Sequence, residues 1–254
     1  MPRKNTRYGW IRDLPDHRDL MYAAPMEVLA QLPSSADLRP GCPPVEDQGQ
    51  LGSCTANAIA GAIEFDQMRQ KLSDIFLPSR LFIYYNERAM EGTVGSDSGA
   101  QIRDGIKSVS QQGACPESDW PYVIADFTMK PPAQAYQDAS AHRAVRYQRL
   151  AQTLSQMKGC LASGFPFVLG FTVYDSFESA TVAQTGHAPM PSPGESVVGG
   201  HAVMAVGYDD GNQWFILRNS WGAGWGMQGY FTLPYTYLLE PNLSSDFWTI
   251  RVVQ

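Results

Sequence analysis

The chain has 254 residues, 44% hydrophobic and 17% charged, so it can bury an ordinary globular core as one large domain or two small lobes. A formal net charge of −6 and a pI near 5.2 argue against binding to nucleic acid, which usually needs a basic face. No apolar run approaches the roughly 20 residues that cross a bilayer, and no signal-peptide core follows the basic N-terminus. The default expectation is a cytoplasmic monomer that binds neither nucleic acid nor membrane, with export by a signal-independent route still open.

The first part of the chain predicts an extended segment followed by helices. Residues 1–36 carry charge, proline and scattered aromatic residues without a clear period. Prolines at 40, 43 and 44 then exclude a regular helix or a central strand, and residues 45–53 form a glycine-punctuated loop. From Cys54 onward apolar residues recur at helical spacing on an almost wholly apolar front, which predicts a buried central helix. Further helices are predicted over 79–90 and 100–112, the latter ending at Gly113.

The second part of the chain predicts mainly strands. Residues 133–144 form a short polar helix or a linker, and residues 178–199 are rich in Gly, Pro and Ser, as in a long surface loop. One helix is expected over 154–162. The predicted strands span 145–150, 165–174, 201–208, 214–219 and 230–233.

Helices before strands indicate an α+β protein with two lobes and a boundary near residues 121–142. We therefore expect an N-terminal extension over 1–36, a helical lobe over 37–135 and a β-rich lobe over 136–254.

Cys54 lies where a glycine-rich loop meets the start of a helix. The first turn of a helix presents free N–H groups and partial positive charge, which would lower the pKa of a thiol and favour the nucleophilic thiolate. The other three cysteines are Cys42, Cys115 and Cys160. They are either buried thiols or include one bridge, Cys42–Cys115 or Cys115–Cys160. No close pair suggests a zinc site.

His201 opens an apolar run that predicts a buried strand, whereas the other three histidines lie in polar or loop surroundings. Asp210-Gly211 separates this run from the next and signals a hairpin. A two-residue turn there would pair position 201 with 220, and a three-residue turn would pair it with 219. In either register Asn219 is a neighbour of His201, and its amide carbonyl can hold one tautomer of the imidazole.

Gln48, six residues before Cys54, supplies a side-chain amide from the preceding loop. Together with the Cys54 backbone N–H, this amide could bind the oxyanion of a tetrahedral intermediate.

Three sequence blocks now resemble those of the papain-like cysteine peptidases, over about residues 37–233 and in the family's order. The blocks are Gln48-Gly49-Gln50-Leu51-Gly52-Ser53-Cys54, Gly200-His201-Ala202-Val203 and Asn219-Ser220-Trp221-Gly222-Ala223-Gly224-Trp225-Gly226. Asp37-Leu38-Arg39 looks like the start of the family's mature enzyme, and the pattern is most similar to that of bacterial members. The resemblance implies a helical left lobe, a β-barrel-like right lobe and an active-site cleft between them.

The resemblance also implies residue roles: Cys54 as nucleophile, His201 as general base and acid, Asn219 as orienting group and Gln48 as oxyanion donor. Trp221 would shield the Asn219–His201 hydrogen bond and line the leaving-group side. Substrate backbone would pair at Gly99, beside Ser98. A roomy apolar pocket would be lined by Gly170, Gly199 and Ala202.

Several positions depart from the family's pattern. Thr55 replaces a tryptophan after the nucleophile, Leu51 stands where many relatives have a disulfide cysteine, and Gly200 precedes the histidine. None of these departures removes a catalytic group. The extension over 1–36 is also much shorter than the family's inhibitory pro-region.

The expected function is cleavage of polypeptides by a papain-like cysteine endopeptidase, through an acyl-enzyme and without metal or organic cofactor. A non-catalytic binding protein on the same scaffold, and an acyl transferase or deamidase using the same groups, are the alternatives. In the extension, Trp10, Ile11, Leu14 and Tyr22 are apolar without a helix to organise them. They either pack on a lobe or lie across the cleft as a short inhibitory strap.

Overall fold

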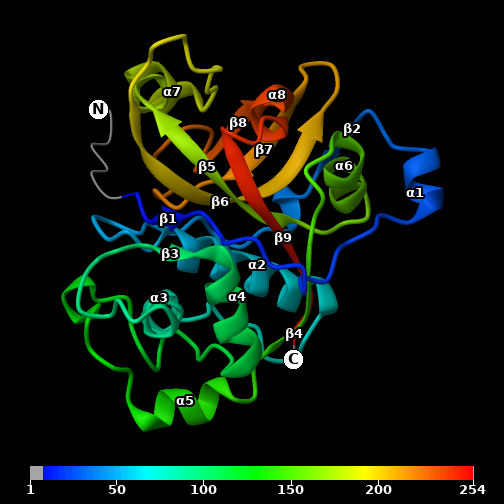
Figure 1. Cartoon of the computed structure of the whole chain (residues 1–254). Coiled ribbons are helices and arrows are strands. Elements are labelled where there is room, and N and C mark those ends of the chain that lie inside the picture. The colour runs from blue at the N-terminus through cyan, green and yellow to red at the C-terminus, as the bar shows by residue number, and fades with distance from the viewer. Residues whose placement is uncertain (1–7, 254) are drawn as a thin grey trace.

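The computed structural model describes residues 8–253, so residues 1–7 of the predicted extension and residue 254 lie outside the described part. It has a helical layer and a large antiparallel sheet, with the first strand of the chain passing between them (Figure 1). The helical layer holds α2 (Cys54–Gln70), α3 (Arg80–Glu91), α4 (Ile102–Gln111) and α5 (Ala133–Ala139). The predicted α+β class and two-lobe fold are confirmed.

The main sheet has seven strands in the order β4-β9-β5-β6-β7-β8, with β2 added on β6. Within the described residues its order is open, so the expected barrel-like closure is a loose description of a curved sheet. The strands are β2 (Ser35–Asp37), β4 (Ala144–Arg149), β5 (Phe167–Tyr174), β6 (Val197–Asp209), β7 (Trp214–Arg218), β8 (Tyr230–Pro234) and β9 (Ser244–Val253).

Helix α2 is the central helix that its apolar sequence predicts. Thirteen of its residues are buried, including Cys54, Ala58 and Ile59, and it contacts β6 and β9 of the sheet as well as α3 and α4. Small residues such as Ala60 and Gly61 let it lie close to the sheet, where the Arg218 side chain packs on Gly61. Cys54 is therefore presented at the junction of the two layers.

The helix ends follow local chemistry. Ser79 caps α3 by accepting a hydrogen bond from the Phe82 N–H at 3.1 Å, and Gly92 closes the helix with a left-handed φ of 73°. Helix α4 ends just before Gly113, whose φ is 84°. Helix α6 has the bounds that the sequence predicts, Leu154–Ala162.

Two parts of the sequence prediction are wrong. The C-terminal strand β9 was not predicted, although it pairs with both β4 and β5. Its residues 244–253 mix apolar and polar types without strict alternation because both faces are largely buried. The predicted loop over 178–199 instead contains a short helix, α7 (Ala180–Thr185), and the start of β6.

The N-terminal extension is ordered into separate pieces. Strand β1 (Trp10–Ile11) pairs in parallel with β3 (Ala100–Gln101), and α1 (Met26–Ala30) packs on α6. Strand β2 then pairs antiparallel with β6. The remaining short elements are α8 (Tyr235–Leu239) and three 3₁₀ turns at Arg39–Gly41, Ile124–Asp126 and Asp175–Glu178.

Candidate active site

Cys54 is the first residue of α2, at the end of the glycine-rich loop. Its sulfur accepts a hydrogen bond from the backbone N–H of Ala202 at 3.3 Å. Because Ala202 directly follows His201, this contact brings the cysteine of the helical layer to the strand that carries the histidine. The sequence prediction that these residues meet across the two lobes agrees with this geometry.

The pKa of the Cys54 thiol differs from the one that the sequence predicts. Burial raises the pKa of the Cys54 thiol to about 12, although the backbone N–H groups of Ala202, Gly9 and Thr55 donate to the sulfur and act in the opposite direction. The predicted lowering of this pKa is therefore wrong for the structure as it stands. Desolvation by burial outweighs the helix start and these hydrogen bonds, because the charged thiolate is disfavoured away from water.

His201 and Asn219 form the expected pair. The imidazole Nε2 lies 2.8 Å from Asn219 Oδ1, and both residues are buried. The same Oδ1 accepts the backbone N–H of Ser220 at 2.8 Å. Since a carbonyl oxygen only accepts, Nε2 carries the proton, and Nδ1 is the basic nitrogen of this tautomer.

The hairpin that joins them is longer than predicted. Asp209 pairs with Trp214, which leaves a four-residue loop between the strands. A bulge interrupts the register of β6 between Ala205 and Gly207. Met204 pairs with Arg218, and continuing this register places Asn219 opposite Val203. Both predicted turns are therefore wrong, yet the contact with His201 forms because residues 201 and 203 share one face of the strand.

Trp221 packs against the histidine of this pair. Its ring stacks on the His201 imidazole with centroids 5.1 Å apart and an interplanar angle of 29°. Phe171 contacts the imidazole edge-on at 5.8 Å. These rings exclude water from the buried hydrogen bond to Asn219.

Gln48 is fully buried beside the same turn. Its Oε1 accepts the Ser220 hydroxyl at 2.6 Å, and its Nε2 donates to the Leu51 carbonyl at 2.8 Å. The Gln48 backbone N–H also donates to the Ser220 carbonyl at 2.9 Å. The loop before the nucleophile is thus tied directly to the loop after Asn219.

The expected substrate-binding residues contact the N-terminal segment. A Cβ atom added to Gly99 would lie 2.2 Å from the Gly9 carbonyl oxygen, and one added to Gly170 would lie 1.9 Å from the Trp10 indole. At Gly199 the Tyr8 side chain would be 2.7 Å away. Ala202 pairs with Gly170 across β5 and β6 and belongs to the same apolar cluster as Trp10.

Ser98 behaves differently from its neighbour Gly99. Its hydroxyl lies 2.9 Å from Thr93 Oγ1 and 3.0 Å from the Gly99 carbonyl oxygen. Asp97, one residue earlier, accepts the Gly52 N–H at 3.0 Å and the Tyr84 hydroxyl. Ser98 therefore shapes the loop that presents Gly99.

The departures from the family's pattern have structural counterparts. Thr55 donates its hydroxyl to Glu87 Oε1 at 2.6 Å beneath the nucleophile, where burial raises the pKa of Glu87 well above its usual range. Leu51 fills an apolar position and is 2% exposed. All four cysteines lie in the described part of the chain, and all are free thiols.

Sequence reasoning missed Asp246. This buried residue of β9 accepts the Trp10 indole N–H at 3.0 Å and the Asp13 backbone N–H at 2.8 Å on the same oxygen. A lone acidic residue within the apolar run around Phe247 and Trp248 was the signal that could have indicated it.

The described residues include no group of three or more His, Cys, Asp or Glu side chains suited to a metal ion. Within residues 8–253, moreover, no helix combines the length and apolarity needed to span a bilayer.

A thiol at a helix start that contacts the residue after a histidine, with that imidazole hydrogen-bonded to an amide carbonyl and helices packed on an antiparallel sheet, is typical of cysteine hydrolases. Residues 32–238 match the model of the papain family of cysteine proteases, and the chain belongs to this family. It is a cysteine protease.

Solved structures agree. The chain is similar to xylellain, a cysteine protease from Xylella fastidiosa, with 45% identity, a TM-score of 0.94, and coverage of 99% of this chain and 98% of xylellain. Procathepsin B S9 from Trypanosoma congolense shares the fold at 19% identity and a TM-score of 0.75, with coverage of 98% and 87%.

Sequence relatives extend the family match. An uncharacterised peptidase C1-like protein of Acanthamoeba polyphaga mimivirus is 42% identical, over 97% of this chain and 87% of its own length. The thiol protease aleurain of Arabidopsis thaliana is 29% identical, over 80% of this chain and 56% of its own length.

Proposed function

We propose that Cys54, His201, Asn219 and Gln48 carry the peptide hydrolysis of this cysteine protease. The observation that supports this most is the joint contact of Cys54 Sγ with the Ala202 N–H at 3.3 Å and of His201 Nε2 with Asn219 at 2.8 Å. These contacts bring a thiol and an oriented imidazole together in one buried place.

In the proposed mechanism the thiol proton passes to Nδ1 of His201, and the thiolate attacks the scissile carbonyl carbon. The C–N bond then breaks, and the imidazolium gives its proton to the leaving amine. Water, deprotonated by the imidazole, next attacks the thioester, and the acid product leaves as the C–S bond breaks. Asn219 keeps the imidazole in the productive tautomer through both steps.

The oxyanion of each tetrahedral intermediate would be stabilised by the Cys54 backbone N–H and by Gln48. The Gln48 amide carries two N–H donors, and its Nε2 uses one of them on the Leu51 carbonyl. The other N–H remains to donate to a developing negative charge while the side chain stays in its buried position. A donor that is already positioned is worth most in such a water-excluded site.

The division of labour follows the two layers. We propose a nucleophile-bearing lobe over 37–135 and a lobe over 136–254 that carries the histidine and asparagine. Gly170, Gly199 and Ala202 would line the main pocket for substrate side chains, and Gly99 would pair with the substrate backbone. Support comes from the way residues 8–10 already use these positions.

A cysteine-directed epoxide, followed by peptide mapping, tests the nucleophile: label on Cys54 supports the mechanism, and absence of label from the folded, uncovered protein contradicts it. Incubation with an unstructured protein distinguishes the three hypotheses for the function. Fragments support peptidase action, an intact mass-shifted product supports the acyl transferase or deamidase, and an unchanged protein supports the binding scaffold.

We further propose that residues 8–19, here called the strap, inhibit the enzyme by covering Cys54. Tyr8 lies against the His201 ring at 5.7 Å and the Trp221 ring at 6.1 Å. The Gly9 backbone packs on Gly52, and the Gly9 carbonyl accepts the Ala100 N–H at 2.8 Å. A substrate would need the space that these residues fill.

The direction of the strap explains why it would resist cleavage. Along the strap the chain passes from Trp221, beside Tyr8, to the pocket that holds Trp10. If the pocket binds the acyl side of a substrate and Trp221 lines the leaving-group side, a substrate runs the opposite way. The strap then presents its peptide bonds in reverse to the thiol.

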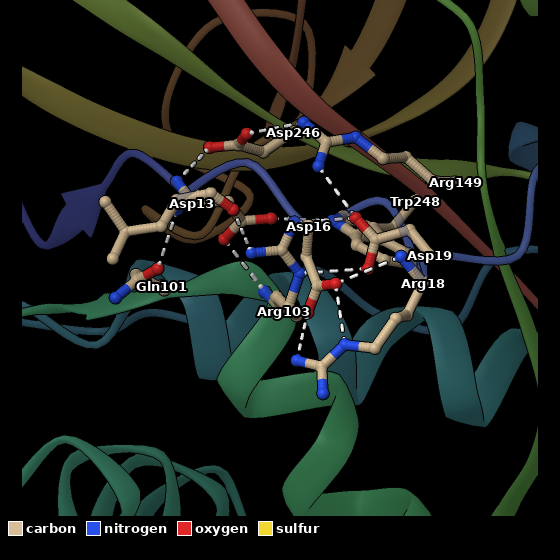
Figure 2. A network of polar contacts seen from close by, with 10 residues as sticks. Asp13, Asp16, Arg18, Asp19, Gln101, Arg103, Arg149, Asp246 and Trp248 are labelled. Atoms are coloured by element: carbon tan, nitrogen blue, oxygen red, sulfur yellow. Dashed lines mark hydrogen bonds and ion pairs between the residues drawn. The ribbon is translucent and has the colours of Figure 1, made fainter.

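The strap is anchored by a polar network at the edge of the cleft (Figure 2). Asp19 forms ion pairs with Arg103 of α4 at 2.6 Å and with Arg149 of β4 at 2.9 Å. Asp13 accepts the Arg103 backbone N–H and, at 2.9 Å, the Trp248 indole N–H. The anchor thus joins the helical layer to the sheet through the strap.

Gly9→Ala tests the inhibition. A Cβ atom at Gly9 would lie 1.6 Å from the Gly52 carbonyl oxygen, so the variant cannot keep the strap seated. Alkylation of Cys54 by iodoacetamide should then become at least about tenfold faster than in the wild type. Gly95→Ala is the matched control, because its Cβ meets nothing within 4 Å. An unchanged alkylation rate in Gly9→Ala would reject the strap.

A further inference from the structure

The Trp10 indole occupies a pocket whose floor is a carboxylate. The ring lies between the backbones of Gly170 and Gly200, where a Cβ atom would approach it to 1.9 Å and 2.8 Å. The indole Nε1–H reaches Asp246 Oδ2 at 3.0 Å, and this contact is buried. The pocket therefore matches a flat apolar body that ends in an N–H donor.

Displacement of the strap would leave this carboxylate short of donors. Asp246 Oδ2 accepts two hydrogen bonds, from Trp10 and from the Asp13 backbone, and both donors belong to the strap. Its other oxygen faces Arg149 at 3.3 Å, a donor that stays with the body of the enzyme. A buried acceptor without donors is unfavourable. A substrate side chain that enters the pocket is therefore favoured if it places an N–H donor at Asp246 Oδ2.

We propose that Asp246 determines substrate specificity by selecting tryptophan in the pocket that Trp10 now fills. In the strap, the backbone N–H of Gly9 donates to the Cys54 sulfur, and the next residue, Trp10, fills the pocket. Because a substrate would run opposite to the strap, the selected tryptophan of a substrate directly precedes the residue whose carbonyl Cys54 attacks. This inference rests on the proposed function and names the substrate class of that site.

Two fluorogenic peptides that differ only in whether one side chain carries an N–H test this proposal. One carries tryptophan at the selected position, and the other carries 3-benzothienylalanine, which has nearly the same shape but no N–H. With the full-length protein we expect kcat/KM to be about tenfold or more higher for tryptophan, the worth of a buried hydrogen bond to a charged group. The ratio of the two values is independent of how often the strap is open.

Asp246→Asn should bring this ratio close to one. Asp246 has a φ of 60°, a backbone conformation that asparagine tolerates well, so the change suits the strand. Because Arg149 can only donate, the asparagine oxygen would turn to Arg149 and its NH₂ group would face the indole N–H. Asp210→Asn, whose carboxylate pairs with Lys158 away from the cleft, is the control and should keep the wild-type ratio.

Equal cleavage of the two peptides by the wild type overturns the proposal, as does a tryptophan preference that survives Asp246→Asn. If neither peptide is cleaved even by Gly9→Ala, in which the strap cannot stay seated, the proposed function fails, and Trp10→Phe then tests the pocket without catalysis. Phenylalanine keeps an aromatic body but lacks the N–H, so Cys54 alkylation should be about tenfold faster than in the wild type. An unchanged rate would mean that the bond to Asp246 selects nothing.

Discussion

The proposed catalytic residues and the strap proposed to cover them are held in different ways. His201, Asn219 and Gln48 are fixed by short buried hydrogen bonds between neighbouring strands and loops. The strap enters the cleft with a glycine and two aromatic rings and is anchored farther along by carboxylates and guanidinium groups. Catalysis and coverage therefore depend on separate residues, and a change in one set should leave the other intact.

The difference predicts opposite effects: changes to the catalytic residues lower activity, and changes to the strap raise it. The ionic anchor also responds to pH and salt, whereas the neutral hydrogen bonds among the catalytic residues do so far less.

The largest effect is expected for Cys54→Ala. Removal of the nucleophile should lower kcat by about 10⁴-fold or more, as measured with the tryptophan peptide. Cys42→Ala is the control, because this half-buried thiol donates to the Leu38 carbonyl at 3.4 Å and lies before the loop that leads to Cys54. Substantial turnover by Cys54→Ala would show that another group performs the chemistry.

Gln48→Ala should lower kcat by about 10²–10³-fold, the cost of one oxyanion donor, with a smaller change in KM. Gln50→Ala, an exposed glutamine of the same loop, should stay near the wild type. Equal losses in both variants would indicate disruption of the loop instead of a lost donor.

Coverage by the strap should weaken as pH rises. Burial, followed by the nearby Asp246 charge, raises the pKa of Asp13 to about 6 in the covered state. A strap released into water would return this carboxyl to an ordinary pKa of about 4, so the covered state binds the proton more tightly. This contribution is fully present below about pH 4 and is lost as pH rises through about 6.

The rate of Cys54 alkylation, taken relative to Asp13→Asn at each pH, isolates this effect from the titration of the thiol itself. The ratio should increase with pH by at most about 100-fold, since each pKa unit is worth tenfold. A ratio that falls with rising pH would reverse the assigned sign.

Asp19→Asn should raise kcat/KM by about tenfold, because it removes two ion pairs between the strap and the body of the enzyme. Asp16→Asn is the matched control, since Asp16 pairs with Arg18 of the same strap. If both variants behave alike, net charge and not the anchor controls coverage.

Local signals in the sequence predicted much of this molecule. The apolar front that begins at Cys54 and the stop at Gly113 both report short-range physics, and the helices they predict are present. The neighbourhood of His201 and Asn219 also followed from two apolar runs joined by a turn, even though the turn itself was wrong.

What the sequence could not predict depends on distant pairing. Strand β9 pairs with β4 and β5 and lacks clean alternation because both of its faces are largely buried. Burial in the folded chain raises the pKa of Cys54, and the backbone N–H of Gly9, 45 residues earlier in the chain, acts against that rise, so the helix start alone does not set it. The role of Asp246 could not be predicted because its partners Trp10 and Asp13 lie at the other end of the sequence.

Residues 8–19 are proposed to cover the catalytic cysteine of a working protease. The most direct measurement replaces the exposed stretch around Leu14, Pro15 and His17 by the recognition sequence of an unrelated serine protease and cuts the folded protein there. Cutting removes the covalent tether of the strap residues that enter the cleft. Peptidase activity should rise after the cut and fall again when a peptide of residues 8–17 is added, whereas activity that the cut leaves unchanged would contradict the account.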